Sequence, residues 1–202
     1  MHVVALLLAY LVGSIPTAYL VGRANGVDLR TVGSGNLGAT NVLRTLGWKP
    51  GLFVYLADMM KGFLPVLLLP RVAGVAPGWP WGVAFGILAI AGHVRPVFLR
   101  GKGGGKGVAT ASGVFLALAP IPFVCALAAF VVIAVITKYV SLGSLVGALV
   151  LPIALALQDR ALTPLVVMSG IVSAFVFWTH RENIVRLRNG NERRISLPGQ
   201  RA

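Results

Sequence analysis

Acidic residues are scarce in this sequence. Only 5 of its 202 residues are Asp or Glu, against 18 Lys and Arg, and the formal net charge is +13. Apolar residues make up 57% of the chain and the mean hydropathy is +0.86, which leaves too little polar surface to cover a soluble globule. We therefore expect lipid as the solvent. A basic excess fixes topology in membrane proteins, and we expect no nucleic acid partner.

Cysteine is nearly absent as well. Cys125 lies alone in the apolar stretch 122–130, so neither a disulfide nor a thiolate metal site can form. The sequence shows no cluster of metal-ligating residues, and we expect neither a metal nor a cofactor. The first 22 residues lack the basic segment and the cleavage site of a signal peptide, so we interpret them as a retained span.

Long apolar runs predict membrane-spanning helices, which need about 20 residues each. A further stretch, 108–136, is too long for one comfortable span and is interrupted by Pro120-Ile121-Pro122, so it forms one bent helix or two short ones. The five clear runs are Val3–Gly22, Gly51–Pro70, Trp79–Val94, Leu142–Leu157 and Leu162–Trp178.

The positive residues decide between these alternatives, because short cytoplasmic loops collect Lys and Arg. With two helices in 108–136, every Lys and Arg lies on one side of the membrane except Lys61, Arg71 and Arg160. We therefore predict an all-α polytopic membrane protein with seven transmembrane helices, an extracytoplasmic N-terminus and a cytoplasmic C-terminus. Residues 1–202 are expected to form one domain and to act as a monomer.

The first polar cluster follows the first run and is rich in glycine. Glycine lets successive backbone N–H groups turn towards one point where an anion can bind, and Arg44 adds a bidentate phosphate donor. A flexible turn is the alternative. The glycine spacing also fits a dinucleotide fingerprint, which we reject because no strand is expected before it. The candidate binding residues are Gly33, Ser34, Gly35, Asn36, Gly38, Thr40, Asn41 and Arg44.

The second polar cluster combines lysines with glycines ahead of a short helical run. A phosphate there would meet ammonium groups and the N–H groups of a helix start together. It is not a Walker A loop, since Gly107 follows Lys106. A basic loop that only fixes topology is the alternative. The candidate phosphate-binding residues are His93, Lys102, Gly103, Gly104, Gly105, Lys106, Gly107 and Thr110.

The third cluster begins at Thr179. A helical continuation would place Asn183 and Arg186 on one face, and the alternative is a basic segment that meets anionic lipid. Asp58 and Lys61 form a fourth polar feature, because ionisable residues at membrane depth normally pair or serve function. We favour a structural pair, and Lys61 is also a candidate phosphate-binding residue.

Four blocks of sequence resemble the bacterial acyl-phosphate:glycerol-3-phosphate acyltransferases. They read GSGNLGATNVLR at 33–44, DMMKG at 58–62, GHVRPVFLRGKGGGKGVAT at 92–110 and HRENIVRL at 180–187. Their order and spacing also agree, so the resemblance covers essentially the whole chain.

The resemblance implies that a fatty acyl group moves from acyl phosphate to the 1-hydroxyl of sn-glycerol 3-phosphate. The products would be phosphate and 1-acyl-sn-glycerol 3-phosphate, a lysophosphatidic acid, in the first acylation of phospholipid biosynthesis. It further implies a seven-helix protein of the bacterial inner membrane, in contact with membrane lipid, whose active site opens to the cytoplasm.

The second block departs from the family pattern, which reads roughly HxFPxFLxFKGGKGVAT. Arg95 and Gly101 replace two aromatic residues, and one additional glycine lies between Lys102 and Lys106. We match Lys106 to the second lysine of the family, because Gly-Val-Ala-Thr follows it unchanged, and Lys102 to the first.

An acyl phosphate is a mixed anhydride with a good leaving group, so the site needs mainly to neutralise charge and to align the hydroxyl. We assign Lys106, Arg44 and the backbone of 103–107 to phosphate and oxyanion charge. The first cluster would orient substrate, and a covalent intermediate on its serine lacks a recognisable nucleophile and base. The expected catalytic residues are Ser34, Arg44, Lys106, His180 and Asn183.

The glycerol 3-phosphate pocket would be completed by His180, Asn183 and Arg186. The proton acceptor is His180, His93 or the substrate's own phosphate, whose second pKa lies near about 6. A transporter of organic anions would use the same cations, but transporters usually carry repeated halves and broken helices at mid-membrane. A basic scaffold would not need an ordered run of small polar residues.

Overall fold

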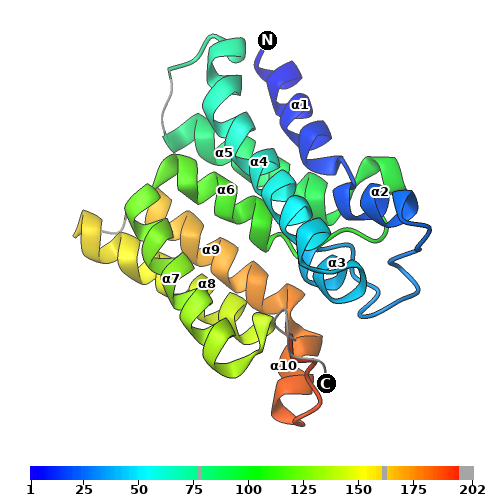
Figure 1. Cartoon of the computed structure of the whole chain (residues 1–202). Helices are drawn as coiled ribbons and strands as arrows, with labels where there is room; N and C mark the ends of the chain where they lie inside the picture. The colour runs from blue at the N-terminus through cyan, green and yellow to red at the C-terminus, as the bar shows by residue number, and fades with distance from the viewer. Residues whose placement is uncertain (77–78, 161–162, 196–202) are drawn as a thin grey trace. The chain divides into compact units, whose positions relative to one another are not determined.

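The computed structural model describes residues 1–76, 79–160 and 163–195. Its regular structure is helical, with ten α-helices and one 3-10 helix, and no strand occurs within these residues (Figure 1). A helix satisfies its own backbone hydrogen bonds, which lipid cannot do, so an all-helical fold suits the apolar composition. The chain divides into two compact units, Met1–Leu118 and Ala119–Ala202. The prediction of one functional domain is a separate matter and stays a prediction.

Unit 1 is arranged around its longest helix, α4. This helix packs against α1, α3, α5 and α6, and it is drawn in cyan in Figure 1. The elements of the unit are α1 (His2–Ser14), α2 (Thr17–Ala24), α3 (Ala39–Leu46), α4 (Trp48–Ala73), α5 (Trp79–Val94), η1 (Val97–Leu99) and α6 (Val108–Leu118).

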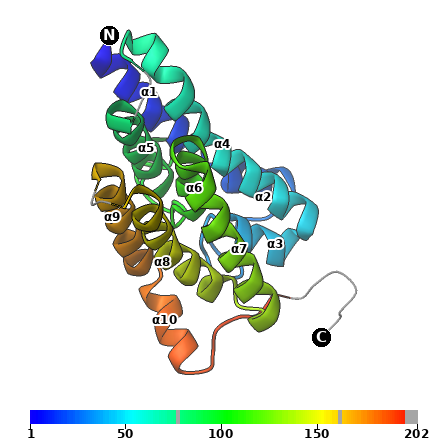
Figure 2. The ribbon, with the colours of Figure 1, turned by 90° about the vertical axis from the view of Figure 1, so that its left-hand side faces the viewer.

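Unit 2 contains α7 (Pro120–Thr137), α8 (Val140–Asp159), α9 (Pro164–Thr179) and α10 (Arg181–Arg188). Helix α8 packs against both α7 and α9. After α10 the chain turns back towards the connection between α7 and α8, as Figure 2 shows, and the Ile195 N–H donates to the Lys138 carbonyl at 2.9 Å.

Large apolar side chains point outwards on the long helices of both units. Examples are Leu7 at 57% exposure, Ile136 at 73% and Leu157 at 74%. Water would penalise so many exposed apolar groups, whereas lipid does not. Five segments are long and apolar enough to cross a membrane: His2–Ala24, Trp48–Ala73, Pro80–Leu99, Pro120–Thr137 and Val140–Asp159.

The ambiguous stretch 108–136 forms two helices that part at Ala119. Pro120 begins α7, where its missing N–H would have no helical partner anyway. The two-helix alternative is therefore confirmed. Helix α6 has only 11 residues and a length of about 16 Å, roughly half of the hydrocarbon core, so seven complete spans stay a prediction.

The first apolar run, predicted as one retained span, forms two consecutive helices within His2–Ala24, a segment long and apolar enough to cross a membrane. Helix α1 ends at Ser14 and α2 begins at Thr17, because Pro16 lacks the N–H that would continue the helical ladder. The start of the last run at Leu162 and the tail residue Arg201 lie outside the described residues.

Glycine brings the helices of unit 1 into close backbone contact. A Cβ added to Gly13 on α1 would lie 2.1 Å from the Ala89 carbonyl oxygen on α5, and one added to Gly113 on α6 would lie 1.8 Å from the Met59 carbonyl oxygen on α4. Small residues permit such approach between membrane helices, where van der Waals packing replaces the hydrophobic effect. These contacts fix the positions of α1, α4, α5 and α6.

Substitution of Gly13 by Ala should lower the melting temperature of the purified protein in detergent. The added methyl group must push α1 away from α5, and overpacking of this kind costs about 1–3 kcal/mol. The matched control is Gly170→Ala on α9, where an added Cβ meets nothing within 4 Å. The control should melt at or slightly above the wild-type temperature, and an equal loss in both variants would contradict the packing account.

Candidate active site

The first glycine segment, defined here as residues 33–41, is held by one buried amide. Asn41 is 2% exposed, and its Oδ1 accepts from the Ser34 N–H at 2.9 Å. Its Nδ2 donates to the carbonyls of Leu29 at 3.1 Å and Val32 at 3.2 Å. The Asn41 side chain therefore links the backbone on both sides of this turn, while the Ser34 side chain remains exposed.

Two glycines of this segment have backbone angles that other residues rarely adopt. The φ angle is +64° at Gly33 and +69° at Gly35. A Cβ on Gly33 would also lie 2.1 Å from the Asn41 Oδ1, so this turn excludes any side chain there. Gly38 then precedes α3, which carries the half-buried residues Thr40 and Arg44 one turn apart.

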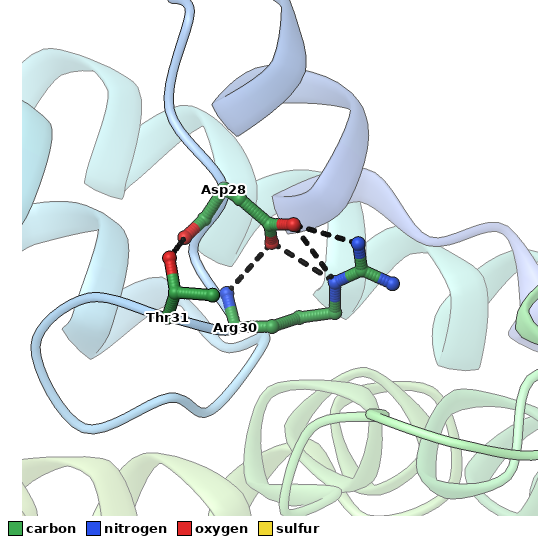
Figure 3. A network of polar contacts seen from close by, with 3 residues as sticks. All are labelled: Asp28, Arg30 and Thr31. Carbon is green, nitrogen blue, oxygen red and sulfur yellow. Dashed lines mark hydrogen bonds and ion pairs between the residues drawn. The ribbon is translucent and has the colours of Figure 1, made fainter.

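An ion pair between Asp28 and Arg30, which the sequence did not reveal, lies in the chain just before this segment. Figure 3 shows the Asp28 carboxylate between the backbone N–H of Arg30, at 3.0 Å, and the Arg30 guanidinium, at 2.6 Å. Thr31 donates its hydroxyl to the Asp28 carbonyl at 3.0 Å. The side-chain and backbone hydrogen bonds from Arg30 lower the pKa of Asp28 to about 2, and the guanidinium also lies 5.1 Å from the Tyr19 ring centroid.

The second glycine segment, defined here as residues 101–107, lies directly against the end of α5. The Gly105 N–H donates to the His93 carbonyl at 3.2 Å. A Cβ on Gly105 would lie 2.1 Å from the His93 Nε2, and one on Gly104 would lie 2.1 Å from the Val94 carbonyl oxygen. Neither position has room for any other residue, so the loop can lie this close only because both are glycine.

The two glycine segments meet through Asn36. Its Nδ2 donates to the Gly104 carbonyl at 3.4 Å, across 68 positions of sequence. The structure thus brings together two clusters that the sequence presented separately. Lys106 is half-buried just before α6 and Lys102 is exposed, whereas Thr110 is fully buried on α6, against α4.

A buried polar group on α4 and α5 lies behind these segments. Lys61 pairs with Asp58, and its Nζ also donates to the Ile15 carbonyl at the break between α1 and α2. The His93 Nδ1 lies 3.9 Å from the Asp58 Oδ1. The expected pairing of Asp58 with Lys61 is therefore confirmed.

A recess of about 220 Å³, a volume that includes the open space at its mouth, adjoins this group. The Thr17 hydroxyl is buried and has no hydrogen-bond partner among the described residues. The wall of the recess therefore contains one buried hydroxyl whose hydrogen-bonding capacity is not used by the described residues. Its lining is formed by Ile15, Pro16, Thr17, Leu37, Asp58, Lys61, His93, Pro96, Gly103, Gly104 and Gly105.

Unit 2 has its own polar centre, and Glu192 is its hub. Its Oε1 accepts from the Asn183 Nδ2 at 2.8 Å and from the Ser141 hydroxyl at 3.0 Å, and its Oε2 accepts from the Arg186 Nε at 2.8 Å. Burial raises the pKa of Glu192, but the hydrogen bonds from Arg186, Asn183 and Ser141 outweigh it and hold the pKa below its ordinary value. Asn183 and Arg186 share one face of α10, as expected.

His180 is oriented by its own backbone turn. Its Nδ1 lies 2.8 Å from the Val176 carbonyl oxygen, which can only accept, so Nδ1 carries a proton. A neutral His180 therefore has its lone pair on Nε2. Sequence reasoning selected His180 and Asn183 but missed Glu192 and Ser141, and the contact between these last two residues joins positions 51 residues apart.

Comparison with known proteins gives one consistent result. The sequence profile described as glycerol-3-phosphate acyltransferase matches residues 3–190. A glycerol-3-phosphate acyltransferase of Geobacter sulfurreducens is 50% identical over 188 residues, which are 93% of this chain and 94% of that protein. One of Thermus thermophilus is 47% identical over 193 residues, 94% of this chain and 93% of the relative.

A solved structure agrees with the sequence relatives. The crystal structure of PlsY (YgiH), an integral membrane glycerol 3-phosphate acyltransferase, in its glycerol 3-phosphate form has a TM-score of 0.88 to this chain. The two are 37% identical, and the match covers 96% of each chain. The lysphosphatidic acid form of PlsY gives a TM-score of 0.85 at 35% identity, over 96% of this chain and 95% of that one.

Removal of the Glu192 charge should lower stability in a pH-dependent way. The folded-state pKa lies below the reference value of 4.5, so the stability from this carboxylate is present above that pH and is lost as the pH falls through the folded-state pKa. We expect Glu192→Gln to melt several degrees below wild type at pH 7 and the gap to shrink as the pH falls below 4.5.

The matched control is Glu182→Gln, because the Glu182 side chain is 74% exposed and lies 3.9 Å from the same Arg186. Exposed pairs of this kind contribute about 0–1 kcal/mol, so its melting curve should follow wild type. A gap for Glu192→Gln that stays constant from pH 7 to acid would show that the carboxylate charge is not the stabilising element.

Proposed function

The chain belongs to the glycerol-3-phosphate acyltransferase family, and from this we propose that it transfers a fatty acyl group from acyl phosphate to the 1-hydroxyl of sn-glycerol 3-phosphate. The products would be 1-acyl-sn-glycerol 3-phosphate, a lysophosphatidic acid, and inorganic phosphate. The observation that carries this proposal is the contact between the two glycine segments through Asn36 and Gly104, which joins two separate anion-binding patterns in one place.

The chemistry asks for charge neutralisation more than for strong acids or bases. The 1-hydroxyl oxygen attacks the acyl carbonyl carbon, the bond from that carbon to the phosphate oxygen breaks, and the phosphate leaves with its electron pair. Lys106 and Arg44 would stabilise the phosphate and the developing oxyanion, with help from backbone N–H groups of the second glycine segment. Ser34 and Thr40 would orient the substrate by hydrogen bonds.

The first polar cluster then divides into two kinds of residue. The Asn41 amide is hydrogen-bonded to the loop backbone, and the Asn36 amide donates to the Gly104 carbonyl. Both residues would therefore act mainly by holding the segments in place. Ser34, which is exposed, would contact substrate directly. The glycines at 33, 35 and 38 provide the turn that presents these groups.

The third cluster would bind the glycerol phosphate. Arg186 and Asn183 are oriented by Glu192, so their positions on α10 are fixed before any substrate arrives. The hydroxyl proton would go to the Nε2 lone pair of His180 or to the substrate's own phosphate, whose second pKa is near about 6. His93 is the third alternative as proton acceptor, although its ring is buried beside Asp58.

The membrane setting of the proposal follows from the charge pattern. We propose seven spans with the N-terminus outside, which would place the three polar clusters at the cytoplasmic face of a bacterial inner membrane. Short helices such as α6 would then cross only part of the bilayer, and the acyl chain would enter from the lipid. The protein would work as a monomer, without a metal or cofactor.

Substitution of Lys106 by Ala should abolish most of the proposed activity. The variant removes a cation from the developing negative charge, which in comparable sites costs about 100- to 1,000-fold in kcat. The assay supplies purified protein with acyl phosphate and glycerol 3-phosphate and measures lysophosphatidic acid. The control is Lys49→Ala, an exposed lysine on α4 whose Nζ lies 5.8 Å from the Trp48 ring centroid, which should keep wild-type turnover.

The same protein in liposomes separates the enzyme from a transporter. Flux of glycerol 3-phosphate across the bilayer without formation of lysophosphatidic acid would reject the acyltransferase. Retained turnover in Lys106→Ala would reject the central role of that lysine while leaving the reaction itself in place.

A further inference from the structure

The ion pair on α4 is buried deeply enough to need a reason. Asp58 is 1% exposed and Lys61 is 6% exposed, and both lie within a segment long and apolar enough to cross a membrane. Removing two charges from water costs several kcal/mol for each ion, so a well-packed apolar pair of similar size would be as stable or more stable. Stability alone therefore does not account for the pair.

Lys61 connects α4 to the break between α1 and α2, which precedes the first glycine segment in the chain. Its Nζ donates to the Ile15 carbonyl at the break at Pro16, where this carbonyl also accepts from the Thr17 N–H at 3.0 Å. From this break the chain runs through α2 into the first glycine segment. Lys61 thus contacts the chain at Ile15, upstream of that segment.

Asp58 connects α4 to the second glycine segment. Its carboxylate lies 3.9 Å from the His93 Nδ1, and His93 holds Gly105 both by its carbonyl and by the contact of its ring. The Asp58–Lys61 pair on α4 therefore contacts Ile15, which precedes the first glycine segment, and His93, which contacts the second one. Gly104, whose carbonyl accepts the bond from Asn36, lines the same recess.

We propose that Asp58 and Lys61 are positioning residues that hold the two glycine segments in register with each other. The inference rests on the proposed acyl transfer for its kinetic consequence. In this role Lys61 acts through the Ile15 carbonyl rather than by contact with substrate phosphate. A shift of about 1 Å in such a site costs about 100-fold in rate, so loss of the pair should reduce turnover without unfolding the protein.

The experiment compares two neutral double variants of equal side-chain length. Asp58→Asn with Lys61→Met removes both charges together, which avoids the uncompensated buried charge that either single variant would leave. Asp58→Asn with Lys61→Gln also removes both charges but keeps an N–H donor directed at the Ile15 carbonyl. Melting temperature and kcat/KM for glycerol 3-phosphate are measured for wild type and both variants.

We expect both double variants to melt near the wild-type temperature. The Met variant should lose about 10- to 100-fold in kcat/KM, and the Gln variant should recover much of that loss. A Met variant that melts like wild type and also turns over like wild type overturns the inference, because a merely structural pair predicts that result. Equal losses in the Met and Gln variants overturn the role of the Ile15 contact.

A charge-preserving variant covers the case in which the neutral pair does not fold. Asp58→Glu keeps the ion pair but displaces the carboxylate by one methylene. A loss of about tenfold in kcat/KM at unchanged melting temperature supports positioning, and wild-type kinetics contradict it.

A readout without catalysis separates this inference from the proposed function. Leu37 is 4% exposed and lines the recess beside Gly103, so a thiol in its place should react slowly with a water-soluble maleimide. In a Cys125→Ala, Leu37→Cys background, the Met double variant should label severalfold faster than the Gln double variant. An unchanged labelling rate rejects the positioning role, whereas wild-type protein that forms no lysophosphatidic acid rejects only the proposed reaction.

Discussion

A charged side chain inside hydrocarbon needs an ion-pair or hydrogen-bond partner from the protein itself, because lipid offers neither water nor hydrogen-bonding groups. Asp58 and Lys61 meet this requirement three positions apart on α4, and the carbonyl of Ile15 supplies a further acceptor. The consequence is geometric. A shift of α4 relative to the break between α1 and α2 would take the Ile15 acceptor away from the Lys61 charge. The elements that carry the glycine segments are therefore held against the same helix.

Scarcity makes each carboxylate of this chain informative. All of them lie in the described part of the structure, and each has a polar partner there. In the two most connected cases, one acid contacts side chains of more than one helix. Asp58 pairs with Lys61 on α4 and lies 3.9 Å from His93 on α5, and Glu192 accepts from Asn183 and Arg186 on α10 and from Ser141 on α8. The acids thus organise a strongly basic protein, and loss of one of them leaves several partners without a common acceptor. The other three pairs are Asp28 with Arg30, Asp159 with Thr163 and Glu182 with Arg186.

Periodicity and charge predicted much of this fold, since local spacing carries that information. The split of 108–136, the pairing of Asp58 with Lys61 and the shared face of Asn183 and Arg186 all depend on neighbours within a few residues. The break at Pro16 was missed because the run Val3–Gly22 was interpreted as one span from its length and overall hydropathy. The Ile15 carbonyl at this break accepts from Lys61, 46 positions away, and no local pattern contains that contact.

The candidate site divides in the same way. Glycine and small polar residues marked both glycine segments in the sequence, but their mutual contact depends on a hydrogen bond across 68 positions. The buried role of Asn41 is equally invisible in sequence, because an asparagine in a glycine-rich loop has the same signature whether it binds a ligand or its own backbone.

The three glycines between Lys102 and Lys106 differ in how closely they pack against their neighbours. Gly104 and Gly105 press against α5, whereas a Cβ on Gly103 would find only ordinary contacts, the nearest at 3.6 Å. Gly103 is therefore the one of the three whose position α5 does not close, although its φ of +72° still favours glycine. A change at Gly104 or Gly105 would push the loop away from α5, whereas the turn has space at Gly103.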